Sequence, residues 1–271
     1  MNERKWAVRI ERARTLQPIY PFAAEGLRFY EKVAEAQRQV YGELEGLLGA
    51  AKKPRAPRTL RDDELDVAVV APRFRCFLSA VENAAPSSLA HSAREIRLAG
   101  DERAGNLLSR LWQSGRDSAQ DDPAPRLLGW IFLQSCAEYL ADHSEVPLPD
   151  ETPSTCPLCS SRPQVGVLRP EGEGGRRSLI CALCAHEWKY RRIVCPYCGE
   201  ENVHKLAVYS AESIPYVRVE ACDTCRNYLK SIDLTKDGRA VPVVDELATI
   251  PLNLWAAEHG YQKPEPNLLG L

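Results

Sequence analysis

The apolar residues of this 271-residue chain follow two different spacings, one in each half. From residue 1 to about residue 143 they recur every three or four positions, which is the period of an amphipathic helix. The segment 27–48 illustrates the pattern with Tyr30, Val33, Ala34, Val40, Tyr41, Leu44, Leu47 and Leu48. We therefore predict an all-helical N-terminal domain over residues 1–147.

Prolines and acidic residues predict where these helices begin and end. The basic, proline-containing stretch 52–58 should form an exposed loop. Asp62 and Asp63 then provide an acidic start for the next helix, which the helix dipole favours. Pro72 and Pro86 are expected to interrupt the helices of this region.

The last helix of this half is expected to be the central buried one. Asp122 and Pro123 mark its start, and its first half is apolar nearly all round. Cys136 lies on its apolar stripe, and Cys76 has apolar neighbours as well. We predict that both are inert core cysteines, which pack as small hydrophobic residues.

Beyond residue 143 the helical period disappears. Three prolines within residues 146–153 predict a stiff linker and a domain boundary. Short β-type runs follow at Val165–Leu168, Ser178–Cys181, Lys189–Val194, Leu206–Tyr209, Tyr216–Glu220 and Tyr228–Asp233. A final helix is predicted from Asp245, a candidate N-cap, to Gly260.

The composition excludes several classes of protein. The net charge of −2 is a poor basis for binding nucleic acid through its phosphates. The basic N-terminus lacks the apolar stretch of a secretory signal, and no run approaches the roughly 20 apolar residues of a membrane span. We therefore expect the protein in the cytoplasm, where cysteines stay reduced.

Eight of the ten cysteines form four C-x-x-C pairs, a spacing typical of metal ligands. Two thiolates on one tight turn supply half of a tetrahedral site. There are 21 residues between pairs one and two and 23 between pairs three and four, but only 10 between pairs two and three. This spacing predicts one site from Cys156, Cys159, Cys181 and Cys184 and another from Cys195, Cys198, Cys222 and Cys225. A cross-braced pairing, one with three and two with four, stays open.

The spacing also suggests a duplicated unit of about 40 residues. We predict modules at 148–194 and 195–240, followed by a C-terminal helix and tail at 241–271. Modules this small rarely fold on an apolar core alone, and a structural metal can supply about 10–16 kcal/mol. Four sulfur ligands suit zinc and iron equally, so the spacing leaves the metal undecided.

The residues close to the cysteine pairs are expected to have structural roles. His186 is expected to be a surface or packing residue, and Trp188 should pack over its turn. A basic cluster nearby should be a solvated hairpin face or else meet an acidic partner; it comprises Arg176, Arg177, Lys189, Arg191 and Arg192.

Several segments resemble the formate dehydrogenase accessory protein family, FdhE. Residues 222–230, CDTCRNYLK, are similar to that family's fourth cysteine motif, and residues 181–188, CALCAHEW, to its second. Residues 245–249, DELAT, and 258–261, EHGY, resemble its closing helix. Ser160 departs from the pattern, since glycine is usual there, and a positive φ would cost serine about 1 kcal/mol.

The resemblance implies a non-enzymatic maturation protein that binds the catalytic subunit of a formate dehydrogenase in the cytoplasm. It also implies two rubredoxin-like centres, with iron favoured and zinc as the alternative. The expected fold is therefore α+β: a helical domain, two tandem rubredoxin-like or zinc-ribbon modules and a C-terminal helix. Self-association is compatible with this picture.

Two other functions remain as alternatives. A zinc ribbon that binds nucleic acid is one, but residues 151–239 hold 13 Lys and Arg against 11 Asp and Glu. A redox protein is the other, either an iron electron carrier or a dithiol catalyst, although dithiol motifs usually occur singly.

Overall fold

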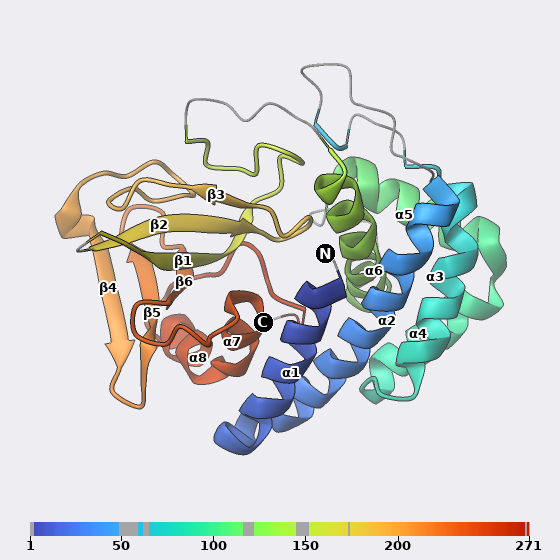
Figure 1. Cartoon of the computed structure of the whole chain (residues 1–271), viewed down its shortest axis with the longest axis horizontal. Helices are drawn as coiled ribbons and strands as arrows, with labels where there is room; N and C mark the ends of the chain where they lie inside the picture. The colour runs from blue at the N-terminus through green and yellow to red at the C-terminus, as the bar shows by residue number, and fades with distance from the viewer. Residues whose placement is uncertain are drawn as a thin grey trace.

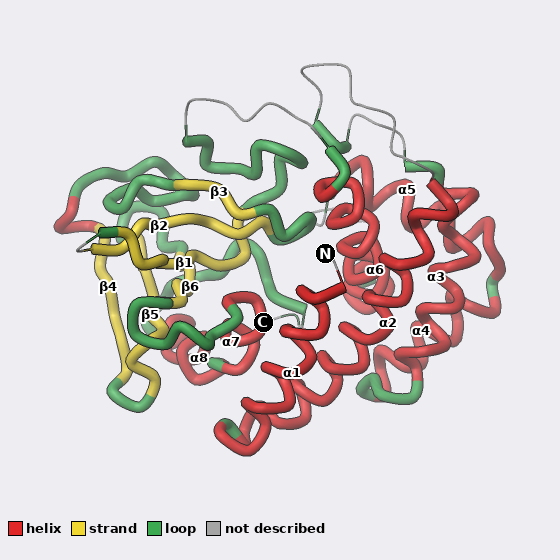
Figure 2. Tube along the Cα trace, in the orientation of Figure 1, coloured by secondary structure: helices red, strands yellow, loops and turns green. Residues whose placement is uncertain are grey.

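The computed structural model describes residues 3–48, 59–61, 65–115, 122–144, 152–172, 174–268 and 270. The helices of the N-terminal half occupy one side of the molecule, and the sheet lies on the other side with the two C-terminal helices beside it (Figures 1 and 2). The predicted loop 52–58 and most of the predicted linker 146–153 lie outside the described residues. The α+β fold class is confirmed by this arrangement.

The helical half is a bundle around one central helix. Its helices are α1 (Glu3–Ile19), α2 (Ala24–Leu48), α3 (Val67–Glu82), α4 (Ser87–Leu98), α5 (Gly100–Ser114) and α6 (Pro123–Asp142), with a 3-10 turn, η1 (Pro21–Ala23). In α6 every residue from Leu128 to Tyr139 is buried. The prediction of a central buried helix is therefore confirmed.

Two predictions about the region around α3 were not confirmed: one is wrong, and the other falls outside the described residues. Pro72 lies inside α3, because the buried side chains of Val70 and Phe74 hold both flanks of the helix against the bundle. Asp62 and Asp63 lie outside the described residues, and Asp66 caps α3 instead by accepting from the Val69 N–H.

The two cysteines outside the pairs differ. Cys136 is fully buried, as predicted. Cys76 is exposed, so its prediction as a core cysteine is wrong. It lies beside the apolar stripe of α3, whose buried members include Phe77 and Leu78, but it faces away from the core.

The C-terminal half is built on one six-stranded sheet, in the order β3-β2-β1-β6-β5-β4. The strands are β1 (Pro163–Glu171), β2 (Gly174–Cys181), β3 (Glu187–Lys189), β4 (Leu206–Ala211), β5 (Ile214–Cys222) and β6 (Tyr228–Asp233), with a 3-10 turn, η2 (Val203–Lys205), before β4. Neighbouring strands are antiparallel except β1 and β6, which run parallel and join the two cysteine-bearing halves.

Five of the six predicted β runs lie in strands. The run Lys189–Val194 was wrong, because β3 ends at Lys189 and the next residues turn toward the third cysteine pair. The predicted closing helix is in fact two helices, α7 (Pro242–Ala248) and α8 (Ile250–Glu258), which meet at Thr249. Asp245 lies within α7 and is not its N-cap.

Helix α7 contacts β1 and β6 of the sheet and also α1 and α2 of the bundle, so it lies between the two halves of the molecule. Among the described helices, none combines the length and the apolar character that crossing a bilayer requires.

Candidate metal centres

The four C-x-x-C turns share one backbone geometry. In each, the N–H of the first cysteine donates to the carbonyl five residues later, at N···O distances of 2.8 to 3.0 Å; the pairs are Cys156 with Ser161, Cys181 with His186, Cys195 with Glu200 and Cys222 with Asn227. Backbone N–H groups also point at sulfur, as Leu183 does at Cys181 and Tyr197 at Cys195. We call these turns knuckles one to four.

The residue after the second cysteine of every knuckle has a positive φ. The four are Ser160 at 59°, Ala185 at 52°, Gly199 at 76° and Arg226 at 59°. From the sequence, a positive φ was expected only at Ser160 and Gly199, in the first and third knuckles. Because the other two carry alanine and arginine, no glycine marked them.

Site one comprises the sulfurs of Cys156, Cys159, Cys181 and Cys184, and all four residues are buried. The Sγ atom of Cys159 lies 3.3 Å from that of Cys181 and 3.6 Å from that of Cys184. The Sγ atoms of Cys156 and Cys184 are 3.5 Å apart.

Site two comprises the sulfurs of Cys195, Cys198, Cys222 and Cys225. The distance from Cys195 Sγ to Cys225 Sγ is 3.7 Å, and that from Cys198 Sγ to Cys222 Sγ is 3.6 Å. Cys198 is exposed and Cys225 is half-buried. Site two is therefore the more open of the two.

Both sulfur sets have the dimensions of a tetrahedral metal site. Four sulfurs about 2.3 Å from a central ion lie about 3.8 Å from one another, whereas a disulfide needs about 2.05 Å. In each set all four sulfurs lie within 4.8 Å of one another. The grouping is the predicted one, pair one with two and pair three with four, so the cross-braced alternative is wrong.

The thiols of each set perturb one another. Hydrogen bonds from Cys156, Cys181 and Cys184 hold the pKa of Cys159 well below its usual value. Burial raises the pKa of Cys181. Such a set cannot hold four adjacent thiolates without a cation, and a divalent metal would stabilise all four in that form.

Site one is supported by the helical half. The Leu60 N–H donates to the carbonyl of Leu158 in knuckle one at 2.7 Å. Gln134 of α6 donates to the carbonyl of Ala182 in knuckle two at 2.8 Å. Trp188 is buried, and its indole N–H donates to the carbonyl of Pro153 just before knuckle one.

Site two is supported mainly by the C-terminal tail. Asp223 in knuckle four accepts from the hydroxyl of Tyr261 at 2.7 Å. Arg226 donates to the carbonyl of His259 at 2.6 Å and lies over the Tyr261 ring. Thr224 donates to Glu200, which links knuckles three and four.

The predicted basic cluster is divided in the structure. Lys189, Arg191 and Arg192 are exposed, as a solvated face requires. Arg177 is buried, contrary to that prediction, and ion-pairs with Glu220 of β5 at 2.5 Å. It also donates to the carbonyls of Arg191 and Val194, so it joins the first cysteine-bearing half to the second.

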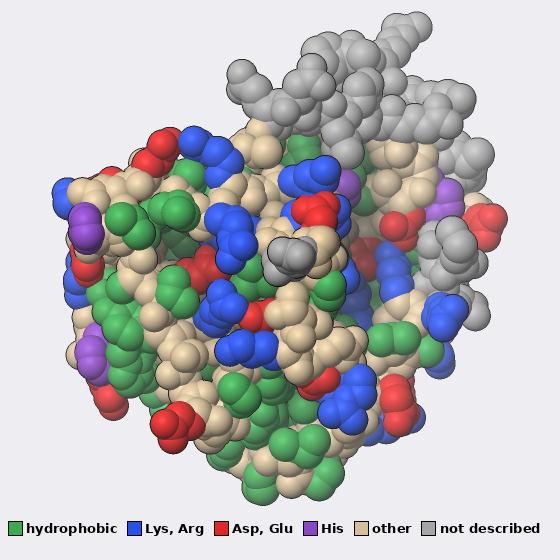
Figure 3. All heavy atoms as spheres, turned by 60° about the vertical axis from the view of Figure 1, so that its left-hand side comes forward, with side chains coloured by type: hydrophobic (Ala, Val, Ile, Leu, Met, Phe, Trp, Pro, Cys, Tyr) green, Lys and Arg blue, Asp and Glu red, His purple; other side chains and the backbone are tan. Residues whose placement is uncertain are grey.

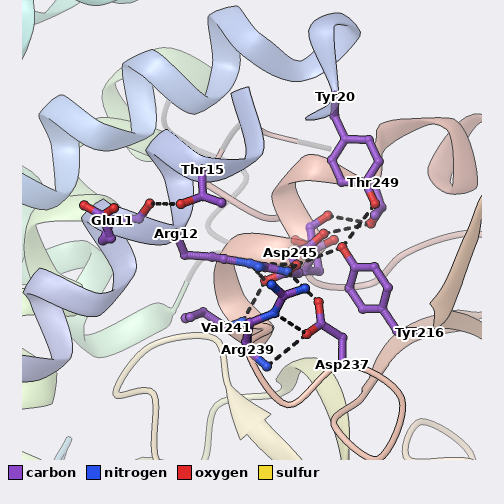
Figure 4. A network of polar contacts seen from close by, with 11 residues as sticks. Glu11, Arg12, Thr15, Tyr20, Tyr216, Asp237, Arg239, Val241, Asp245 and Thr249 are labelled. Carbon is purple, nitrogen blue, oxygen red and sulfur yellow. Dashed lines mark hydrogen bonds and ion pairs between the residues drawn. The ribbon is translucent and has the colours of Figure 1, made fainter. Parts of the chain in front are cut away.

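Two buried ionic clusters around α7 were not identified from the sequence. Arg12 of α1 donates to Asp245 at 2.5 Å, and Asp245 also accepts from Tyr216 of β5 at 2.9 Å (Figure 4). The next residue, Glu246, ion-pairs with Lys230 at 2.9 Å and also with Lys263.

The segments that resemble the FdhE family contain several of these ionic residues. DELAT includes Asp245 and Glu246, and CDTCRNYLK ends on Lys230. These motif residues therefore join α1, β6 and the tail to α7. The sequence did contain a sign of these clusters, because Asp245 and Glu246 are two adjacent acidic residues in an otherwise apolar helix. Their partners could not be identified, because they are distant in the chain.

Comparisons with known proteins agree with this architecture. Residues 155–192 match the family model described as "FdhE, central domain", and residues 181–269 match "FdhE, C-terminal domain". A Protein FdhE homolog from Aquifex aeolicus is 38% identical over 116 residues, which cover 42% of this chain and 41% of that protein. One from Pseudomonas aeruginosa is 42% identical and aligned over 40% of its length.

Other relatives match almost the whole chain. A Protein FdhE homolog from Pectobacterium carotovorum is 28% identical over 97% of this chain and 86% of its own length. A crystal structure of the FdhE protein from Pseudomonas aeruginosa superimposes with a TM-score of 0.70 and 26% identity, covering 99% of this chain and 96% of that one. Domain models, curated relatives and a solved structure together support the assignment of this chain to the FdhE family.

Proposed function

We propose that this protein binds the catalytic subunit of a formate dehydrogenase in the cytoplasm and is required for that enzyme to become active. The observation that carries the proposal is the pair of four-cysteine sites built into one sheet that packs on a helical bundle. Family membership supports an accessory role over a catalytic one. The buried polar groups around α7 form ion pairs that connect α7 to α1 and β6, so their contacts are structural.

Each site holds one metal ion in this proposal, bound by Cys156, Cys159, Cys181 and Cys184 or by Cys195, Cys198, Cys222 and Cys225. Iron is favoured by the family resemblance, and zinc is the alternative that four sulfurs also suit. Metal content and an absorption spectrum of anaerobically purified protein distinguish them. About two irons per chain with thiolate charge-transfer bands support iron, whereas two zincs and a featureless spectrum from iron-replete cells overturn it.

The function is tested in cells that lack the endogenous protein. The wild-type chain should restore formate dehydrogenase activity and should co-purify with the catalytic subunit. The double variant Cys222→Ser, Cys225→Ser should lose both, because it removes half of the ligands of site two. Cys76→Ser is the matched control, since Cys76 is exposed and outside the knuckles. Full activity of the double variant contradicts the proposal.

A further inference from the structure

Strand β4 forms one open edge of the sheet (Figure 1). It pairs with β5 on one side, and no described strand lies against its other side. An edge strand presents unpaired backbone N–H and C=O groups that another extended chain can pair with. Val208 and Tyr209 in the middle of β4 are 58% and 37% exposed, so the edge is accessible.

On one face of the sheet, β4 borders a cavity of about 500 Å³. Its wall is mostly apolar and includes Leu168, Ile193, Pro196, Val203, Leu206 and Val208. Ile193 and Val203 are more than half exposed and extend the apolar wall of the cavity, and such contiguous apolar patches mark interaction sites. Cys195 and Cys222 of site two also line this cavity.

On the other face, β4 borders an aromatic surface. The Tyr209 ring lies 4.5 Å from the ring of Trp255 of α8, and Leu254 beside it is 58% exposed. Because successive side chains of a strand point to opposite faces, Val208 and Tyr209 extend apolar surface to both sides of this edge. Hydrophobic side chains gather on this side of the molecule (Figure 3).

The charge at the cavity favours an acidic group. Three arginines line it, but the guanidinium groups of Arg177 and Arg218 are paired with Glu220 and Asp233. Arg192 is exposed and has no ionic or hydrogen-bonding partner among the described residues. One positive charge at the rim is therefore uncompensated, and a carboxylate is its complement.

We propose that β4 is the docking edge for an extended segment of the partner protein, which pairs with β4 as an additional strand. Its apolar side chains alternate, one set entering the cavity and the other packing on Tyr209 and Trp255, and an acidic side chain meets Arg192. This inference rests on the proposed function for the identity of the partner, the formate dehydrogenase catalytic subunit. The bound segment then lies against the wall of site two.

The edge is tested first without the enzyme, using a fluorescent peptide of about seven residues that alternates valine with phenylalanine, so that both faces are apolar, and carries one glutamate in place of a valine. The wild-type chain should bind it saturably. Val208→Glu and Ile193→Glu should each weaken binding about tenfold or more, the effect expected at a central apolar contact. Leu98→Glu is the matched control, because Leu98 is 73% exposed on the distant α4.

Arg192→Glu should weaken binding of this peptide but leave binding of a version with glutamine in place of glutamate nearly unchanged. Retained metal content confirms that each variant is folded. Absence of saturable binding, or equal binding by Val208→Glu, overturns the inference. So does a wild-type dimer that Val208→Glu dissociates, since the edge would then pair with a second copy of this chain.

Formate dehydrogenase activation separates this inference from the proposed function. If the wild-type chain and Val208→Glu activate the enzyme equally, the proposed function stands and the docking edge is wrong. If peptide binding depends on Val208 and Ile193 but the wild-type chain fails to activate the enzyme, the edge binds extended segments and the proposed function is wrong.

Discussion

At the scale of single residues, the strained positions of the knuckles offer a direct test. Ser160 and Gly199 occupy equivalent places with φ of 59° and 76°. Ser160 is exposed, and a Cβ on Gly199 would have no neighbour within 4 Å, so packing should not obscure the backbone effect. We expect Ser160→Gly to stabilise by about 1 kcal/mol and Gly199→Ser to destabilise by a similar amount.

Thermal unfolding of the metal-loaded protein measures both changes, and about 1 kcal/mol corresponds to a midpoint shift of about 2 °C in a chain of this size. Ser154→Gly is the control, since Ser154 is exposed and is not among the residues with positive φ. A lower midpoint for Ser160→Gly would show that the serine side chain stabilises the turn.

Lys230 predicts a pH dependence. Burial lowers its pKa from 10.5 to about 8, although the Glu246 carboxylate opposes the shift. Because the folded pKa is below the unfolded one, the charged lysine costs stability below pH 8, and that cost is relieved as the pH rises from about 8 toward 10.5. The full effect approaches about 3 kcal/mol at about 1.4 kcal/mol per unit.

The difference in unfolding midpoint between the wild type and Lys230→Met should therefore shift in favour of the wild type between pH 7.5 and pH 10. Glu246 keeps its ion pair with Lys263 in that variant. Lys236→Met is the matched control for the substitution itself, because Lys236 is exposed. A constant difference for Lys230→Met would mean that Lys230 stays charged over this range.

At the scale of elements, the contact between α1 and α7 contains a buried ion pair between Arg12 and Asp245. Asp245 is fully buried, and it accepts from Arg12 and from the Val241 N–H (Figure 4). Asp245→Asn leaves the Arg12 charge without its main partner, and breaking a buried pair costs about 3–5 kcal/mol. We expect a large fall in the unfolding midpoint.

The matched control is Arg14→Gln, on the same helix. Arg14 is half exposed and pairs with Glu31 and Glu35, and such surface pairs contribute about 0–1 kcal/mol. Equal destabilisation by the two variants would show that burial of the Arg12 pair is unimportant.

Sequence reasoning located the strands and the grouping of the cysteines into two clusters, because both depend on local chemistry. Tyr228–Asp233 was predicted with its correct bounds, and the pairing of the knuckles followed from their spacing. The parallel pairing of β1 with β6 has no local signal, because about 60 residues separate the strands. The Arg12–Asp245 pair was missed for the same reason, since 233 positions separate its members.

Proline and cysteine positions were misjudged where tertiary packing decided the outcome. Pro72 was expected to break a helix, but the buried residues around it keep α3 continuous. Cys76 was assigned to the core on the strength of apolar neighbours, yet a single helical position away from the stripe is enough to expose it.

At the scale of the whole molecule, the two metal sites lie in different environments. All four cysteines of site one are buried, whereas Cys198 and Cys225 of site two reach solvent. A chelator should therefore remove two metals in two phases, the fast one from site two. Cys156→Ser, Cys159→Ser should retain the fast phase and Cys222→Ser, Cys225→Ser the slow phase. Release in a single phase would contradict this difference.

The same difference between the sites predicts which elements are destabilised when a cysteine of site one or of site two is replaced. Knuckles one and two hydrogen-bond to the helical half through Leu60 and Gln134, while site two is held mainly by the tail. Cys159→Ser should therefore speed amide hydrogen exchange in α6 as well as in β1 and β2, because Gln134 loses its fixed partner. Cys225→Ser should speed exchange in β4, β5 and the tail and leave α6 unchanged. Equal exchange in α6 for both variants would mean that the bundle holds its shape independently of site one, and that the metals stabilise the sheet alone.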